Sequence, residues 1–112
     1  MPSIFHIVSV EAWPAAQAAG EYRGDTLATE GFIHCSRAEQ VAAVANAFYA
    51  GRAHLALLRI DRALVTSEVR DELSDGDVFP HIYGPLNLDA IVEVMPFVLG
   101  TDGRFGEVRE RA

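Results

Sequence analysis

The sequence predicts a single α+β domain with mixed or largely antiparallel sheets, and three observations lead to this class. The chain has 112 residues, half of them hydrophobic, which is enough for one domain with its own core. Helical patterns cluster in the first half of the chain, whereas strand patterns dominate the second half. The regular alternation of strands and helices that is typical of a parallel sheet does not occur.

The chain begins with a predicted strand and a predicted helix. Ser3–Ser9 is short, apolar and rich in β-branched residues, which predicts a buried strand. The alanine-rich stretch Val10–Ala19 predicts a helix with Ser9 as its N-cap and Gly20 at its end. Because Pro14 lies close to the helix start, we expect either an irregular first turn or a later beginning.

A second strand and the longest helix follow a predicted loop over Glu21–Gly31. The strand covers Phe32–Cys35. The next residues, Ser36–Glu39, have the form of a capping box, in which the serine hydroxyl accepts a hydrogen bond from the N3 amide. The helix then runs over Arg37–Ala50 with its apolar residues at helical spacing, and Gly51 ends it.

The remainder of the chain is predicted to be mostly extended. The apolar run His54–Asp61 predicts a central strand, and a short strand is expected near Val69. Ser74–Asp77 has the composition of a turn. Val78–Tyr83 predicts a further extended segment, which Gly84 and Pro85 end.

The last predicted elements are short. Leu86–Ala90 predicts one helical turn, and Ile91–Leu99 predicts the final strand. Proline cannot donate a ladder hydrogen bond, so Pro96 places that strand at an edge or a bulge of the sheet.

Alternation of side chains along the second strand brings two polar residues together. Ile33 and Cys35 share an apolar face that is expected to point to the core, which leaves His34 and Ser36 on the opposite face. The adjacent helix N-terminus, with Arg37, would favour an anion there. The alternative is that Ser36 only caps its helix and His34 is a structural residue.

Two further segments carry groups that suit catalysis or binding. His6 lies within an apolar strand, where it is either a core histidine with hydrogen-bond partners or a general acid–base group. Alternation over the later extended segment places Phe79, His81 and Tyr83 on one face, and an aromatic cluster at a sheet edge is the alternative. The predicted cleft is lined by His6, His34, Ser36 and the segment Phe79–Leu86.

The sequence offers four further groups to consider. Cys35 and His34 point apart because they are adjacent in a strand, so Cys35 is expected to be a small buried residue rather than a nucleophile. The four histidines and one cysteine lack the short spacing of metal ligands, and no metal is expected. Glu72 is a candidate site carboxylate because it precedes the aromatic cluster. Arg59 could pair with a carboxylate or reach an anion.

Charge and hydropathy exclude several function classes. The formal net charge of −7 repels nucleic-acid backbones, so nucleic acid is not expected as a partner. No stretch approaches the apolar length of a membrane helix, and the N-terminus lacks the pattern of a secretory signal. A single cysteine fits a reducing compartment. The expected location is therefore the cytoplasm.

Five segments, in this order, carry a resemblance to a known family: Ile4–His6, Ala12–Trp13, Glu30–Ser36, Gln40–Val41 and Phe79–Leu86. They resemble a bacterial family catalogued as domain of unknown function 952, and the resemblance spans nearly the whole chain. That family is in turn similar to the ADP-ribosyltransferase superfamily. The pattern looks most like the RNA 2′-phosphotransferases, which hold NAD in a cleft between two short sheets.

The resemblance implies a fold and a set of site residues. The fold is ADP-ribosyltransferase-like, with two small mixed or antiparallel sheets forming a cleft and with two main helices. The implied ligand is NAD or a related nucleotide, used as substrate. The implied catalytic residues are His6 near the nicotinamide ribose, His34 beside it, and His81. The implied binding residues are Ser36 and Arg37 toward the phosphates, with Phe79 and Tyr83.

Three functions remain open at the level of the sequence. The first is ADP-ribosyl or 2′-phosphoryl transfer. Ile7 stands where many of the transferases have glycine, and no glutamate clearly matches their third motif, so the second is a non-catalytic module that binds a nucleotide or another small anion. The third is a structural or partner-binding protein whose histidines are satisfied core residues.

Overall fold

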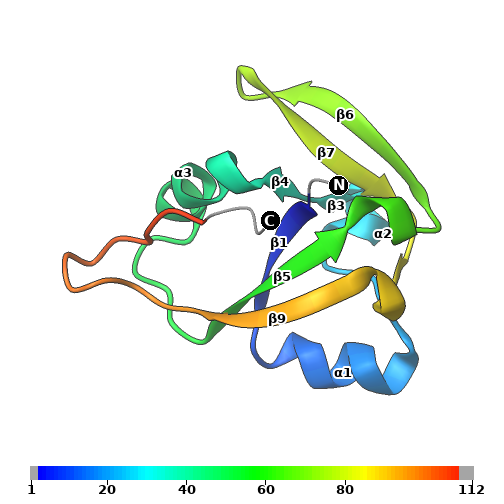
Figure 1. Cartoon of the computed structure of the whole chain (residues 1–112), viewed down its shortest axis with the longest axis horizontal. Coiled ribbons are helices and arrows are strands. Elements are labelled where there is room, and N and C mark those ends of the chain that lie inside the picture. Colours follow the sequence, from blue (N-terminus) through cyan, green and yellow to red (C-terminus); the bar gives the residue numbers. More distant parts are fainter. Residues whose placement is uncertain (1–2, 109–112) are drawn as a thin grey trace.

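The computed structural model describes residues 3–108 and shows an α+β fold built on three sheets (Figure 1). All strand pairings between described residues are antiparallel. The elements are, in chain order, β1 (Ser3–Ser9), α1 (Ala12–Ala19), β2 (Glu21–Tyr22), α2 (Thr26–Glu30), β3 (Ile33–His34), β4 (Ser36–Arg37), α3 (Ala38–Phe48), β5 (Leu55–Asp61), η1 (Arg62–Leu64), β6 (Glu68–Ser74), β7 (Asp77–Tyr83), β8 (Leu86–Asn87), η2 (Leu88–Ala90) and β9 (Ile91–Phe97). Among the described helices, none is long and apolar enough to cross a membrane.

The largest sheet has four strands in the order β4-β1-β5-β9. Strands β1 and β5 pair along their whole length, from Ser3 opposite Asp61 to Ser9 opposite Leu55. Because they are the two inner strands, their side chains are covered on both faces, which explains their nearly continuous apolar sequence. The prediction of a central strand over 54–61 is confirmed, and β9 with Pro96 lies at the sheet edge as predicted.

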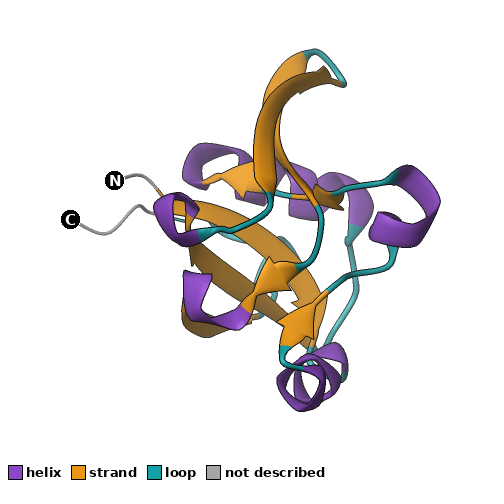
Figure 2. Ribbon diagram, turned by 90° about the vertical axis from the view of Figure 1, so that its right-hand side faces the viewer, coloured by secondary structure: helices purple, strands orange, loops and turns teal. Residues whose placement is uncertain are grey.

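A three-stranded sheet, β3-β7-β6, and a two-stranded sheet, β2-β8, complete the fold. Strands β6 and β7 form a long hairpin that projects from the rest of the molecule (Figures 1 and 2). Its turn contains Asp75 and Gly76, both with positive φ, as the predicted turn over 74–77 requires. The expectation of two sheets is therefore wrong, because β2 and β8 form a separate ribbon.

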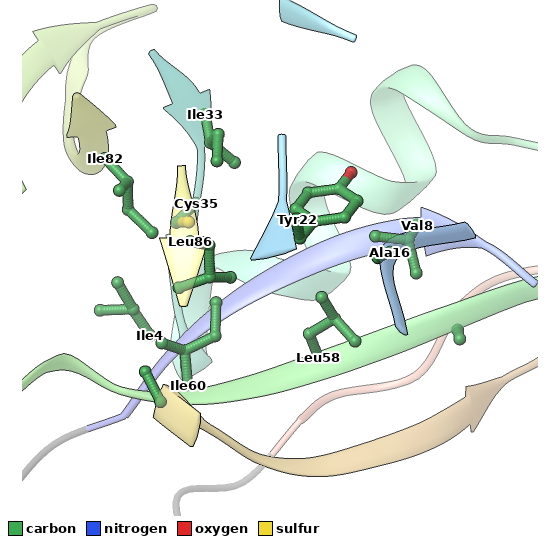
Figure 3. Close-up of a cluster of buried hydrophobic side chains, with 12 residues drawn as sticks. Ile4, Val8, Ala16, Tyr22, Ile33, Cys35, Leu58, Ile60, Ile82 and Leu86 are labelled. Atoms are coloured by element: carbon green, nitrogen blue, oxygen red, sulfur yellow. The ribbon is translucent and has the colours of Figure 1, made fainter. Parts of the chain in front are cut away.

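Alternating side chains of the four-stranded sheet build two hydrophobic clusters, one on each face. One cluster receives Ile4 and Val8 of β1, and it packs against Ile33 and Ile82 of the three-stranded sheet (Figure 3). The other cluster receives Phe5 together with side chains of α3 and β9. Each fully buried aliphatic side chain stabilises the fold by about 1.5–3 kcal/mol. His6 belongs to the same face of β1 as Ile4 and Val8, so it points toward the three-stranded sheet.

The predicted loop over 21–31 is wrong, because the structure forms β2 and α2 there. The two-residue strand β2 is stabilised by pairing with the distant strand β8. In this pair Glu21 faces Asn87 and Tyr22 faces Leu86. Helix α2 ends at Gly31, whose φ of 89° lies in the left-handed region that glycine adopts readily. The one predicted helical turn over 86–90 divides into β8 and the 3₁₀ turn η2.

The start of α3 differs from the predicted capping box by one position. Arg37, not Ser36, occupies the N-cap, and its backbone N–H donates to the side-chain oxygen of Gln40 over 2.8 Å. Ser36 instead pairs with Phe5 in β4, which withdraws it from a capping role. The predicted strand over 32–35 is correspondingly split into β3 and β4.

Helix α1 confirms the expectation of a later beginning. It starts at Ala12, so Pro14 falls in the first turn, where a missing N–H removes no helical hydrogen bond. The hydroxyl of Ser9 accepts a hydrogen bond from the Ala12 N–H at 3.3 Å, although Glu11 is the formal N-cap. Gly20 ends the helix with a φ of 81°, as predicted.

Substitution of Gly84 by alanine is expected to destabilise the fold by about 1–3 kcal/mol. Gly84 has a φ of +151°, and an added Cβ would lie 2.5 Å from the hydroxyl oxygen of Ser67. That hydroxyl donates to the carbonyl of Pro85, so the clash also disturbs the turn between β7 and β8. Urea denaturation measures the loss. Gly106→Ala is the matched control, because its Cβ would meet no atom within 4 Å, and equal stability of the two variants would contradict the prediction.

Candidate functional site

A cavity of about 500 Å³ lies where the four-stranded sheet, the three-stranded sheet and the end of α3 meet. Five of the seven site residues implied by the resemblance line it, namely His6, His34, Ser36, Phe79 and His81. The other two, Arg37 and Tyr83, do not line it. The cavity therefore brings together three histidines from β1, β3 and β7, which are far apart in the sequence.

His6 makes a hydrogen bond through each of its ring nitrogens. Nδ1 donates to the backbone carbonyl of His34 at 2.5 Å, and Nε2 accepts from the hydroxyl of Tyr22 at 2.8 Å. Because a carbonyl can only accept, this network assigns the proton to Nδ1. Burial of the ring disfavours the imidazolium and lowers the pKa of His6 to about 4. His6 is therefore a neutral imidazole with a fixed tautomer near neutral pH.

Tyr22 is a cavity residue that the sequence analysis missed, because it lies in the segment that was predicted to be a loop. Its side chain is buried, and burial raises the pKa of the phenol well above its ordinary value. The hydroxyl thus stays protonated while it donates to His6. Gly24 packs against this ring, since a Cβ there would lie 3.1 Å from the Tyr22 oxygen.

His34 presents its side chain to the cavity and keeps a carboxylate beside it. Its Nε2 lies 3.2 Å from a carboxylate oxygen of Glu30, the last residue of α2, and both side chains are nearly half exposed. The prediction that His34 points away from the core while Ile33 and Cys35 point into it is confirmed, since the latter two are almost fully buried. Glu30 was missed as a site residue.

Four rings form a cluster on one face of the three-stranded sheet. The antiparallel register places His34 directly opposite His81, and their ring centroids are 5.3 Å apart. The ring of Phe32 stacks on His81 at 4.2 Å and also contacts Tyr83 at 5.2 Å. Cross-strand pairs of this kind stabilise sheets, and here they also fix the orientation of two imidazoles.

Glu72 supports this cluster from β6 without lining the cavity. One of its oxygens accepts hydrogen bonds from the Tyr83 hydroxyl at 2.5 Å and from His81 Nδ1 at 2.9 Å. These two bonds hold the pKa of Glu72 below its ordinary value. The bond between Tyr83 and Glu72 also raises the pKa of Tyr83. The guanidinium of Arg70 lies 4.4 Å from the centre of the Tyr83 ring.

The positive charge at the cavity comes from a different arginine than expected. Arg37 donates to the carbonyl of Val78 and lies near the carboxylates of Glu39 and Asp77, which holds it outside the cavity. Arg52 lines the cavity instead, with its guanidinium 5.1 Å from the centre of the Tyr49 ring. Over residues 3–108, no carboxylate forms an ion pair with Arg52.

Cys35 is buried at the wall of the cavity, as expected for a small core residue. Burial raises the pKa of its thiol, so it lacks the thiolate character of a nucleophile. Within the described part of the chain, no group of three or more histidine, cysteine, aspartate or glutamate side chains is arranged to hold a metal ion.

Comparison with known proteins identifies relatives but no activity. A family model described as "Protein of unknown function (DUF952)" matches residues 7–94. The X-ray crystal structure of protein CC0527 from Caulobacter crescentus is similar, with 32% identity, a TM-score of 0.84 and 93% coverage of each chain. The solution NMR structure of CC0527 gives 33% identity and a TM-score of 0.80, over 93% of this chain and 91% of that chain. No curated protein matches the chain.

The low pKa of His6 predicts that acid destabilises the fold between pH 6.5 and about 4. The unfolded chain takes up a proton near pH 6.5, whereas folded His6 does so only near pH 4, so protons favour unfolding in this window. His6 is expected to lower the free energy of unfolding by at most about 1.4 kcal/mol for each pH unit in this window. Urea denaturation across the window, in the wild type and in His6→Asn, measures it.

The variant is expected to lose this part of the pH dependence, because asparagine does not take up a proton. The remaining pH dependence should be the same, because both proteins retain the same carboxylates. His54→Asn is the control, since His54 is exposed outside the cavity and its φ of 61° suits asparagine. A pH dependence that is identical in wild type and His6→Asn would contradict the assignment.

Proposed function

The chain belongs to the DUF952 family of proteins of unknown function, and we propose that its cavity binds NAD or a related nucleotide and supports ADP-ribosyl or 2′-phosphoryl transfer. One observation carries the proposal. His6 and His34, from two different sheets, are joined by a hydrogen bond at the wall of a cavity of about 500 Å³. This is the pair that the resemblance to the ADP-ribosyltransferase superfamily implies at the nicotinamide ribose.

The lining of the cavity supports a nucleotide by its chemistry. Phe79 and Tyr49 offer ring surfaces for a base. Arg52, which has no ion pair within residues 3–108, offers a guanidinium for a phosphate. The carboxylates of Asp25 and Glu30 can accept hydrogen bonds from ribose hydroxyls. A site with a few converging polar groups among apolar walls is typical of small-molecule binding.

The transfer step requires charge stabilisation and a proton acceptor. The bond between ribose C1′ and nicotinamide breaks with its electron pair leaving on nicotinamide. An oxygen of the acceptor then bonds to C1′ and loses its proton. We assign the stabilisation of positive charge on the ribose to the carboxylates of Asp25 and Glu30. His34, backed by Glu30, suits the role of proton acceptor, and neutral His6 positions the ribose.

A non-catalytic module for nucleotides or small anions is the second candidate, and the position of Glu72 favours it. Glu72 was the sequence candidate for the transferases' third-motif carboxylate. Its hydrogen bonds to His81 and Tyr83 keep it behind the cavity wall rather than at the cavity. A cavity that retains the ligand-binding residues without that carboxylate would bind without turnover.

Calorimetric titration with NAD and with ADP-ribose tests binding, with His34→Ala as the variant. We expect a loss of affinity of at least ten-fold, about 1.4 kcal/mol, because the exposed imidazole faces the cavity. The fold is expected to persist, since His6 bonds to the backbone carbonyl of residue 34, which alanine retains. The control His54→Asn should bind like wild type.

Release of nicotinamide from NAD, measured by chromatography, separates the two candidates. Release that depends on His34 supports the transferase, whereas saturable binding without release supports the module. If neither NAD nor ADP-ribose binds, and saturating ligand fails to add the roughly 2.7 kcal/mol of stability expected at about 100 times Kd, both candidates are wrong.

Arg52→Ala tests the phosphate contact separately. We expect about a ten-fold loss of affinity for ADP-ribose and little change for adenosine, which lacks the phosphates. The loss should shrink at high salt, because the contact is at an exposed position. Arg104→Ala, which removes an exposed arginine away from the cavity, is the control. Equal losses for both ligands would contradict a phosphate role.

A further inference from the structure

His81 is held in the way expected of a histidine that presents a hydrogen-bond acceptor. Its Nδ1 lies 2.9 Å from a carboxylate oxygen of Glu72, and the hydrogen bonds that Glu72 receives keep it ionised. An ionised carboxylate can only accept, so Nδ1 carries a ring proton, and in the neutral ring Nε2 is left with a free lone pair. The two nitrogens point in different directions, and Nε2 therefore faces away from Glu72.

No described residue supplies a hydrogen-bond partner to Nε2, although His81 is only 4% exposed. Every other buried side-chain nitrogen or oxygen of residues 3–108 has a partner. A buried acceptor without a partner costs about 1–3 kcal/mol. Native structures keep few such groups, and those they keep frequently serve a function.

The surroundings of His81 hold its ring in place. Phe32 stacks on one face of the ring at 4.2 Å, which fixes its plane. Glu72 is itself held by Tyr83, and Arg70 lies over the Tyr83 ring. His81 also lines the cavity that contains His34, and the His34 ring contacts it edge-on with centroids 5.3 Å apart. These five neighbours thus surround one imidazole whose Nε2 has no partner among residues 3–108.

We propose that Nε2 of His81 accepts a hydrogen bond from an O–H or N–H group of the molecule that occupies the cavity, and that Glu72 is the positioning residue that fixes its tautomer. This inference rests on the proposed function, because the occupant is the nucleotide proposed above. Atom Nε2 is buried in the free protein, so a donor group reaches it only when a neighbouring ring turns. The ring that we expect to turn is His34, which is exposed and contacts His81.

The same geometry selects against an anion at this position. A lone pair backed by an ionised carboxylate repels a phosphate oxygen, whereas it attracts a neutral donor such as a ribose hydroxyl or a carboxamide N–H. We therefore expect the phosphates of the ligand near Arg52 and its uncharged donor group at His81. His81 is on this basis a specificity-determining residue of the site.

Long-range ¹H–¹⁵N correlation spectra of the imidazoles test the inference without reliance on a variant. In the free wild-type protein we expect His81 to show a protonated Nδ1 and a pyridine-like Nε2. Addition of NAD should move the Nε2 resonance of His81 in the same saturation curve as the resonances of His34. A protonated Nε2 in the free protein would overturn the inference.

Glu72→Gln tests the positioning role, with Glu68→Gln as the matched control on the same strand outside the cavity. Loss of the carboxylate charge should mix the two tautomers of His81 and weaken NAD binding about ten-fold, which corresponds to about 1.4 kcal/mol. The control, which breaks only an exposed pair with Arg70, should change neither. An unchanged tautomer and unchanged affinity in Glu72→Gln would overturn the role of Glu72.

The outcomes separate this inference from the proposed function. If NAD shifts the resonances of His6 and His34 while Nε2 of His81 stays unchanged, the inference is wrong and the proposed function stands. If NAD shifts none of the three histidines, the proposed function fails and the inference fails with it. If all three respond together and Glu72→Gln alters only the tautomer and the affinity, both are supported.

Discussion

The hydrogen bond from His6 Nδ1 to the carbonyl of His34 is the contact on which the architecture of the site depends. It joins β1 of the four-stranded sheet to β3 of the three-stranded sheet, beside a hydrophobic cluster that also spans both. A polar ring at this place is tolerated only because Tyr22 satisfies its second nitrogen. The bond and the cluster together hold the two sheets against each other, and with them the cavity residues that the sheets carry.

The three histidines of the cavity have the same chemistry but different environments, and the environments divide their roles. His6 is desolvated with both nitrogens engaged, so it stays neutral and rigid. His34 is exposed beside Glu30, where a ligand or water can contact its ring. His81 is buried against Glu72, and its Nε2 has no hydrogen-bond partner in the described part of the chain. Environment rather than residue type assigns acid, base and binding roles in enzyme sites.

Much of this arrangement could be predicted from the sequence. The parts that could not be predicted depend on contacts between distant segments. Periodicity predicted β1, β5 and α3, and alternation placed His34 on the outward face, because these features depend on local pattern. Strand β2 with Tyr22 was missed because two residues carry no periodicity and form a strand only by pairing with β8. Ser36 was misassigned as a cap because its backbone pairs with Phe5, a contact that local sequence does not encode.

The distribution of charge within the cavity bears on the chemistry of its occupant. Carboxylates of Asp25, Glu30 and Asp75 line it, whereas Arg52 is an arginine at the same cavity without an ion-pair partner among residues 3–108. A ligand that is anionic throughout would be repelled by the carboxylates, and a purely cationic ligand would leave Arg52 unpaired. A nucleotide combines phosphates for the arginine with hydroxyl donors for the carboxylates. The net charge of −7 thus argues against long nucleic acids without opposing a small nucleotide, because repulsion acts on the whole surface and recognition acts within the cavity.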